Sequence, residues 1–238
     1  MNEIKGFFDE YAKFVDDVTS EIGKKDELFM ERAAEISRWL DGNFSRMDNA
    51  VAGLAGEAGE IGDLWKKLKF HNKELSEENR QKLVDELSDV CWYAMQAAIA
   101  LAREAAADGE VPVGAVVTRN GEIVSVGRNR REKDKNALAH AEFEAIDRAC
   151  KALGGWRLWE CELFVTLEPC PMCAGAIINS RIKRVVFGAY DPKAGSCGSV
   201  NNLFSFPYNH SPEVEGGFMQ DECALLLKRF FAELRRTK

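Results

Sequence analysis

The sequence has no long apolar run, and this absence excludes a membrane-spanning helix. Its longest apolar stretch without a charged side chain, Val90–Ala102, is well short of the ~20 residues that cross a bilayer. The segment Met1–Lys5 also lacks the basic stretch followed by an apolar one that marks a secretory signal. We therefore expect a cytoplasmic protein with no membrane partner.

The cysteines lack the even number and the dense spacing of a secreted disulfide scaffold. A reducing compartment fits this usage better, so a cluster among them indicates metal binding or catalysis before it indicates a disulfide. The seven cysteines are Cys91, Cys150, Cys161, Cys170, Cys173, Cys197 and Cys223.

Proline is missing from the first 111 residues, and all six prolines follow from Pro112 onward. Charge divides the chain in the same way, because residues 1–100 carry 13 basic against 21 acidic side chains, whereas residues 101–238 carry 19 against 18. The content of 46% hydrophobic and 30% charged residues is that of a folded globular protein. These contrasts predict an acidic, helical first part and a second part of mixed structure.

Apolar residues recur at helical spacing in the first part of the chain. They predict helices over Phe7–Val18, Leu28–Leu40 and Asn49–Phe70, and a last helix that opens after Ser76, a residue suited to the N-cap. This last helix meets no breaker before Asp108–Gly109, so it would extend over about 31 residues and roughly 46 Å. A helix of that length would belong to both parts of the chain.

After Gly109 the pattern changes to strands alternating with helices, which predicts an α/β/α layered domain. The first two strands flank Asn120-Gly121, a pair of residues that favours a tight β-hairpin turn. The predicted strands are Val111–Thr118, Ile123–Val126, Leu163–Thr166 and Arg184–Ala189, and the predicted helices are Ala139–Leu153, Pro171–Asn179 and Asp221–Arg236.

One motif in the second part has the composition of a catalytic zinc site. His140-Ala141-Glu142 is followed, 30 residues after the histidine, by Cys170-Pro171-Met172-Cys173. Zinc prefers imidazole and thiolate ligands, and three protein ligands leave the fourth tetrahedral position open for water. Glu142 is too close in sequence to His140 to be a comfortable fourth ligand, but it can reach that water and shuttle protons. The alternatives for a bare Cys-x-x-Cys are a redox pair and a structural zinc half-site.

Residues 95–238 resemble bacterial tRNA adenosine deaminases of the TadA type. The resemblance rests on the zinc motif and on the runs Gly109–Val116, Phe164–Cys170, Ala174–Ile177, Arg184–Ala189 and Asp191–Lys193. It implies a cytidine-deaminase-like α/β/α three-layer fold, with zinc held by His140, Cys170 and Cys173 and with Glu142 as the catalytic proton carrier. The implied reaction converts adenosine to inosine at the anticodon wobble position, for which the base must be extruded into the pocket.

The same resemblance places three further residues at the substrate. Asn129 would bind the target base, Asp191 would contact the substrate backbone, and Asn209 would lie beside the mouth of the pocket. Without the resemblance, Asn129 and Asn209 are more simply interpreted as turn residues. RNA also needs positive charge near the mouth. The candidates are Arg128, Arg130, Arg131, Lys133 and Lys135 on one loop and Lys228, Arg229, Arg235, Arg236 and Lys238 near the end, although a solvated charged loop is an equal alternative.

The first part carries two pairs of carboxylates at helical i, i+3 spacing, Glu57 with Glu60 and Glu86 with Asp89. If the two helices pack antiparallel, the four side chains converge, and hard oxygen ligands in that number suit Mg²⁺ or Mn²⁺. A single pair of this kind does not indicate a metal site, because acidic helices commonly expose such carboxylates to solvent. The two pairs together favour a metal site.

Residues 49–98 resemble MazG-type all-α nucleoside triphosphate pyrophosphohydrolases, both in these carboxylates and in the runs Leu64–His71 and Asp85–Tyr93. The resemblance implies magnesium on the four carboxylates and phosphate contacts from lysines such as Lys66, Lys67 and Lys69. That family normally continues into further nucleotide-binding residues, whereas this chain runs into Met95–Ala107, the first helix of the deaminase-like part. We therefore expect a truncated unit whose remaining role is dimerisation or scaffolding.

Together these observations predict an all-α MazG-like bundle, residues 1–94, followed by a zinc deaminase domain, residues 95–238. The predicted function is deamination of adenosine in tRNA by a homodimer or higher homo-oligomer, with the tRNA anticodon loop as partner and Zn²⁺ as cofactor. Two alternatives remain open: a deaminase of a free nucleobase, nucleoside or nucleotide, and a magnesium-dependent pyrophosphohydrolase acting through the N-terminal unit. Glu142 argues against a third, a non-catalytic zinc-stabilised binding module.

Overall fold

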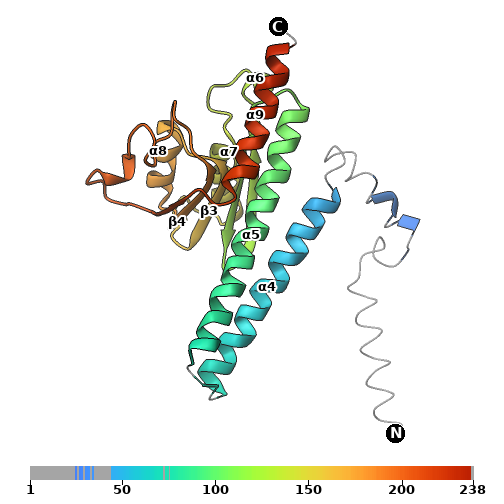
Figure 1. Ribbon diagram of the computed structural model, residues 1–238, viewed down its shortest axis with the longest axis vertical. Coiled ribbons are helices and arrows are strands. Elements are labelled where there is room, and N and C mark those ends of the chain that lie inside the picture. The colour runs from blue at the N-terminus through green and yellow to red at the C-terminus, as the bar shows by residue number, and fades with distance from the viewer. Residues whose placement is uncertain are drawn as a thin grey trace. The chain divides into compact units, whose positions relative to one another are not determined.

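The computed structural model describes residues 25, 27–28, 30–32, 34, 44–71, 73–74 and 76–236 (Figure 1). The chain divides into two compact units, residues 1–45 and residues 46–238. The described part of the predicted helix Leu28–Leu40 is helical, and its remainder lies outside the described residues, as does all of the predicted helix Phe7–Val18. Among the described residues, no helix is both long and apolar enough to cross a membrane.

Two long helices, α4 (Phe44–Phe70) and α5 (Glu77–Ala107), precede the sheet. Helix α5 is the predicted long helix of 31 residues. Ser76 caps it, because the Ser76 hydroxyl accepts a hydrogen bond from the Asn79 backbone N–H at 3.3 Å. The C-terminal half of α5 is buried from Ala94 onward, whereas most of its N-terminal half is exposed. Helix α4 begins earlier than the predicted Asn49.

The sheet has five strands in the order β2-β1-β3-β4-β5. Strand β1 is antiparallel to β2 and to β3, and β3, β4 and β5 run parallel. The hairpin prediction is confirmed, since Asn120 and Gly121 have φ values of 54° and 78°, as a tight primed turn requires. The strands are β1 (Gly114–Arg119), β2 (Glu122–Arg128), β3 (Cys161–Leu167), β4 (Arg184–Ala189) and β5 (Glu213–Gly216), the last of which was not predicted.

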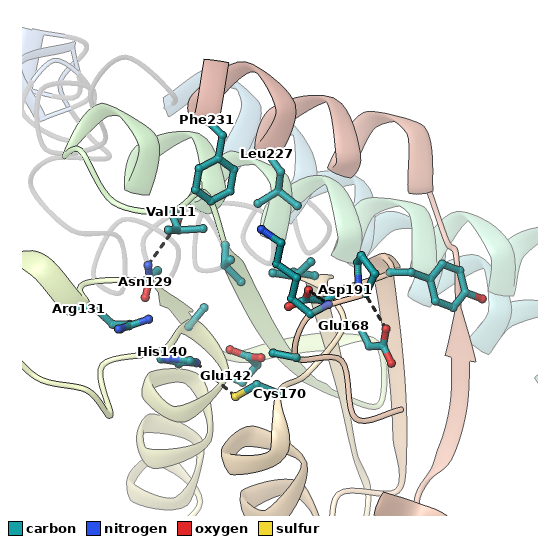
Figure 2. A pocket seen from close by; sticks show the side chains of 17 residues that line it. Val111, Asn129, Arg131, His140, Glu142, Glu168, Cys170, Asp191, Leu227 and Phe231 are labelled. Carbon is teal, nitrogen blue, oxygen red and sulfur yellow. Dashed lines mark hydrogen bonds between the residues drawn. The ribbon is translucent and has the colours of Figure 1, made fainter. Parts of the chain in front are cut away.

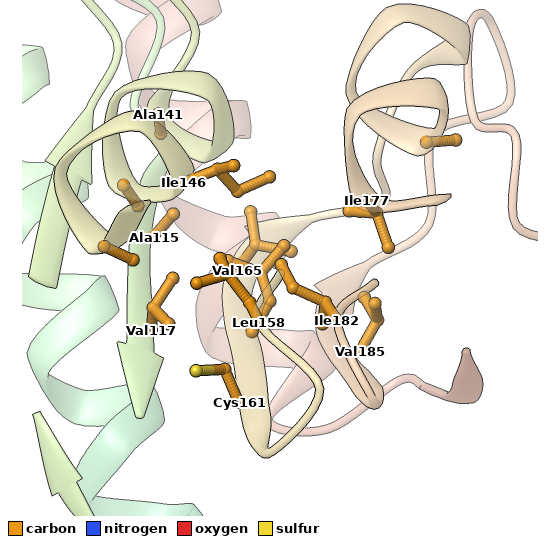
Figure 3. Packing of buried hydrophobic residues seen from close by; sticks show 14 of the residues in the cluster. Ala115, Val117, Ala141, Ile146, Leu158, Cys161, Val165, Ile177, Ile182 and Val185 are labelled. Carbon is orange, nitrogen blue, oxygen red and sulfur yellow. The ribbon is translucent and has the colours of Figure 1, made fainter. Parts of the chain in front are cut away.

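Helices cover both faces of the sheet, so the predicted three-layer α/β/α architecture is confirmed. Helices α7 (Ala141–Ala152) and α8 (Pro171–Ser180) pack on one face, and α5 and α9 (Gln220–Arg236) pack on the other. Successive strand residues alternate between the two cores, as Val116 and Val117 do. Figure 3 shows the core under α7 and α8, where Val117, Val165 and Val185 meet Ile146 and Ile177.

Strand β2 lies unusually close to the first turns of α7. A Cβ on Gly127 would lie 2.2 Å from the Ala141 carbonyl oxygen and 2.6 Å from the Ala145 backbone nitrogen. The buried Ser125 hydroxyl also donates a hydrogen bond to the Ala145 carbonyl at 2.7 Å. These contacts fix the N-terminal end of α7 against the sheet.

We predict that Gly127→Ala lowers the free energy of unfolding by about 1–3 kcal/mol, because the added methyl group overpacks the contact between β2 and α7. Gly175→Ala is the control, because a Cβ at Gly175 of α8 meets nothing within 4 Å. That change should be neutral or stabilising by up to about 1 kcal/mol. Urea denaturation measures both variants, and equal midpoints for the two would contradict the close approach of β2.

Candidate functional site

The predicted zinc ligands lie at the N-termini of two helices. His140 is the N-cap residue of α7 and Cys170 that of α8, and Cys173 follows in the first turn of α8. His140 Nδ1 lies 3.7 Å from Cys170 Sγ and 3.5 Å from Cys173 Sγ. The three donor atoms all lie within 4.8 Å of one another. Residues 30 positions apart in the chain therefore form one cluster.

The donor set fits zinc. Zn–S bonds of about 2.3 Å and Zn–N bonds of about 2.0–2.1 Å at tetrahedral angles give an N···S separation of about 3.6 Å, which agrees with both observed distances. A hydrogen bond from Cys173, together with the neighbouring His140, lowers the pKa of Cys170 to about 4. Cys170 is therefore poised as the thiolate that a metal ligand must be, and the α8 N-terminus favours that charge.

Glu142 lies beside these ligands in the first turn of α7, and its side chain is almost entirely buried. Burial raises the pKa of Glu142 to about 7. A carboxyl group with such a pKa can both accept and donate a proton near neutral pH, which is what a general acid–base requires.

A pocket of about 370 Å³ opens above this cluster. Figure 2 shows His140, Glu142 and Cys170 at its floor and Leu227 and Phe231 of α9 at its roof. Two of the predicted substrate residues, Asn129 and Asp191, line the same pocket. The third, Asn209, does not line it and is exposed in the loop before β5.

The loop that carries Asp191 is organised by a buried carboxylate, Glu168, to which the sequence reasoning assigned no role. Its oxygens accept hydrogen bonds from the backbone N–H groups of Asp191, Cys197 and Ser199, at 3.0, 2.9 and 3.0 Å, and from the Ser199 hydroxyl. Burial disfavours the charged form, but the hydrogen bonds from Ser199 and Asp191 outweigh it and lower the pKa of Glu168. Glu168 therefore holds one wall of the pocket.

The predicted basic loop is largely engaged with carboxylates. Arg128 and Lys133 both pair with Asp108, at 2.9 and 3.0 Å, and Arg130 pairs with Asp134 at 3.1 Å. Arg131 lines the pocket instead. On α9, Lys228 and Arg235 line a second groove that shares Tyr190 and Phe231 with the pocket, while Lys238 lies outside the described residues.

The carboxylates of the N-terminal part converge only in part. Carboxylate oxygens of Glu57, Glu60 and Glu86 lie within 4.8 Å of one another, and Asp89 is not in this group. Burial, a hydrogen bond with Glu86 and the charge of Asp89 raise the pKa of Glu57. Exposed acidic groups of this kind are common without an ion, so the magnesium site stays a prediction. Of the three predicted phosphate contacts, Lys67 lines the hollow beside Glu60 and Glu86.

We predict that Glu168→Gln lowers the free energy of unfolding by about 1–3 kcal/mol, because the new NH₂ group must face a buried backbone donor in either orientation. Hydrogen exchange should also become faster in residues 191–199. Ser199→Ala is the control, since it removes one donor and leaves the carboxylate with the backbone donors of Asp191, Cys197 and Ser199. If both variants exchanged like the parent, Glu168 would not organise the loop.

Known proteins that are similar to this chain match the part that contains the cluster of His140, Cys170 and Cys173. The profile of the MafB19-like deaminase family matches residues 92–235. A tRNA-specific adenosine deaminase of Bacillus subtilis is 52% identical over 145 residues, which are 60% of this chain and 90% of that protein. A Deinococcus deserti protein named tRNA(Ile)-lysidine synthase is 45% identical over 157 residues, which are 66% of this chain and 30% of that protein.

A solved structure from a study of A-to-I editing by tRNA:A34 deaminases at the wobble position matches with a TM-score of 0.56 and 42% sequence identity. The match covers 57% of this chain and 99% of the other. The predicted cytidine-deaminase-like fold is thus confirmed, whereas the MazG-like resemblance and the domain boundary after residue 94 stay predictions. Through residues 92–235, the chain belongs to the MafB19-like deaminase family, and it belongs with the tRNA-specific adenosine deaminases.

Proposed function

We propose that this protein deaminates adenosine to inosine in tRNA and that its target is the anticodon wobble position. The observation that carries the proposal is the position of Glu142 beside His140 and Cys170 at the floor of one pocket. The 52% identity to a tRNA-specific adenosine deaminase supports RNA as the substrate. Assembly as a homodimer and location in the cytoplasm stay predictions.

The chemistry follows from what the floor of the pocket offers. Zinc on His140, Cys170 and Cys173 would supply the Lewis acidity that makes water reactive toward C6 of adenine. Glu142 takes one proton from the water and delivers it to the purine ring, then takes a second from the hydroxyl group now on C6 and delivers it to the leaving amine. Water and adenosine are thereby converted to inosine and ammonia, and the carboxyl group returns to its starting state.

The walls of the pocket position the base. Val111 and Leu167 provide apolar surface, and Asn129 presents a buried amide, so a purine that enters meets both packing and hydrogen-bonding groups. The site lies below α9 inside a pocket, so a stacked base must be extruded from its strand to reach it. Arg131 and Lys193 are the arginine and lysine among the lining residues, and they are the candidates for contacts with RNA phosphates beside the carboxylates of Glu142, Glu168 and Asp191.

We predict that Glu142→Gln lowers kcat on an adenosine-containing anticodon stem-loop by at least about 100-fold, because proton transfer contributes about 10²–10⁴-fold. Inosine and ammonia are measured with zinc-loaded protein. The control is Asp147→Asn on the same helix, an exposed residue paired with Lys151, which should leave kcat unchanged.

The same assay is repeated with free adenosine, guanine, cytidine and dCTP in place of the stem-loop. Inosine formed in the stem-loop alone is the expected result. Turnover of the free compounds alone would instead establish a deaminase of nucleotide metabolism. Magnesium-dependent release of pyrophosphate from dCTP without zinc would favour the N-terminal pyrophosphohydrolase.

We predict about one zinc per chain in the purified protein, measured by elemental mass spectrometry. Cys173→Ser should lose most of this zinc, because it replaces a buried ligand with a weaker one. Cys150→Ser is the control, since Cys150 is a free cysteine of α7 and is not among the donor atoms of the cluster. Equal zinc content in both variants would overturn the ligand assignment.

A further inference from the structure

Glu110 is a second carboxylate buried beside the pocket, and the mechanism above does not use it. Its side chain is 1% exposed although it carries an ionisable group. The residue directly follows the end of α5, where Gly109 adopts a φ of +80° and the Glu110 backbone N–H donates to the Ala105 carbonyl at 2.9 Å. This helix ending fixes the backbone of Glu110.

The carboxylate faces hydrogen-bond donors from two segments. Oε1 accepts from the Lys133 backbone N–H at 2.7 Å, and Oε2 accepts from the Glu132 backbone N–H at 3.2 Å. Oε2 also accepts from the side-chain amide of Asn129 at 3.5 Å. Both oxygens act as acceptors in these contacts, so an acceptor placed at any of these positions would be repelled.

This arrangement gives the Asn129 side chain one orientation. Its Nδ2 also donates to the Val111 carbonyl at 3.3 Å, so both neighbours of that nitrogen are acceptors. If the amide were flipped, its oxygen would face a carbonyl and a carboxylate, which is repulsive. Figure 2 shows Asn129 joined to Val111 in this way on the wall of the pocket, beside Arg131.

We propose that Glu110 is a positioning residue: its buried carboxylate holds the Asn129 amide in a single orientation toward the base and ties it to helix α6 (Arg131–Asp134). The inference rests on the proposed function, because Asn129 is taken to bind the target base. Glu110 itself does not line the pocket, so it acts on the substrate through Asn129.

Glu110→Gln separates the parts of this arrangement, because a glutamine has only one acceptor oxygen. If that oxygen stays opposite Lys133, the new NH₂ group faces both Glu132 and Asn129. If the amide turns over, the NH₂ group faces the Lys133 N–H across the shortest of these contacts. The first orientation is expected, because it keeps this shortest contact, so the Glu132 N–H and the Asn129 amide lose their acceptor.

The test is a double-mutant cycle on zinc-loaded protein with the anticodon stem-loop. Glu110→Gln and Asn129→Ala should each lower kcat by roughly 10- to 100-fold, since a misplaced binding group costs about that much. KM should change little, because phosphate contacts dominate the affinity for RNA. The double variant should be no slower than Asn129→Ala alone, because Glu110 acts through Asn129. Losses that multiply would overturn the proposal.

Glu132→Gln is the matched control. It makes the same change of charge on the neighbouring segment, its side chain is exposed, and it keeps the backbone N–H that Glu110 accepts. Its kcat should equal that of the parent. A loss equal to that of Glu110→Gln would show that only the local charge matters, against the proposal.

A second readout does not depend on turnover. The side-chain ¹H–¹⁵N signals of Asn129, assigned by their absence from Asn129→Ala, should be shifted and should exchange faster with water in Glu110→Gln but not in Glu132→Gln. If the parent protein fails to deaminate the stem-loop, the proposed function fails while this measurement still tests Glu110.

Glu110→Asp serves if Glu110→Gln does not fold. It keeps both acceptor oxygens but withdraws them by one methylene, so a smaller shift of the Asn129 signals is expected. Unchanged Asn129 signals in a folded Glu110 variant would overturn the proposal.

Discussion

Helices α7 and α8 begin within contact distance of each other, and the site depends on this meeting of two N-termini. Each helix places a predicted zinc ligand at its N-cap position, so the separation of the helix ends sets the separation of the donor atoms. A shift of either helix along its axis would increase the distances between His140 Nδ1 and the two cysteine sulfur atoms. The sheet prevents such a shift, because β2 holds the first turns of α7 and β3 leads within three residues to Cys170.

Two buried carboxylates extend this rigid floor into the walls of the pocket. Loops line most of the pocket, and their backbone N–H groups need acceptors wherever water is excluded. Glu168 satisfies such groups in the loop that carries Asp191, and Glu110 does the same at α6. Each carboxylate costs desolvation free energy, which several hydrogen bonds offset, and a fully satisfied network of this kind confers a defined shape.

Much of the deaminase part could be predicted from the sequence, because its signals are local. Strand β4 has the predicted bounds, and the Asn120-Gly121 turn followed from backbone sterics alone. Strand β5 was missed because Glu213–Gly216 is a short edge segment without apolar alternation. It pairs with β4 through its backbone, and such pairing leaves little trace in side-chain type.

The clustering of His140, Cys170 and Cys173 could also be predicted, since the spacing of the motif is typical of a metal site. Glu110 and Glu168 gave a weaker signal, because each is only a charged residue next to an apolar segment, and the sequence alone could not identify their hydrogen-bond partners. Those partners lie 19 to 31 residues away on loops whose course is set only by folding. Asn209, which the resemblance places beside the mouth of the pocket, is not among its lining residues, and its role at the substrate stays a prediction.

Helix α5 imposes an order on folding. Strands that follow α5 in the chain pack against its apolar half, from Ala94 to Ala105. During synthesis on the ribosome, this half of α5 therefore emerges before the strands that bury it. Once the sheet forms, the docked half of α5 provides the helical nucleus from which its exposed turns extend without a second nucleation step. Ala50 and Leu54 of α4 join the same buried cluster as Met95 of α5. Helices α4 and α5 are therefore stabilised by strands that are synthesised after them.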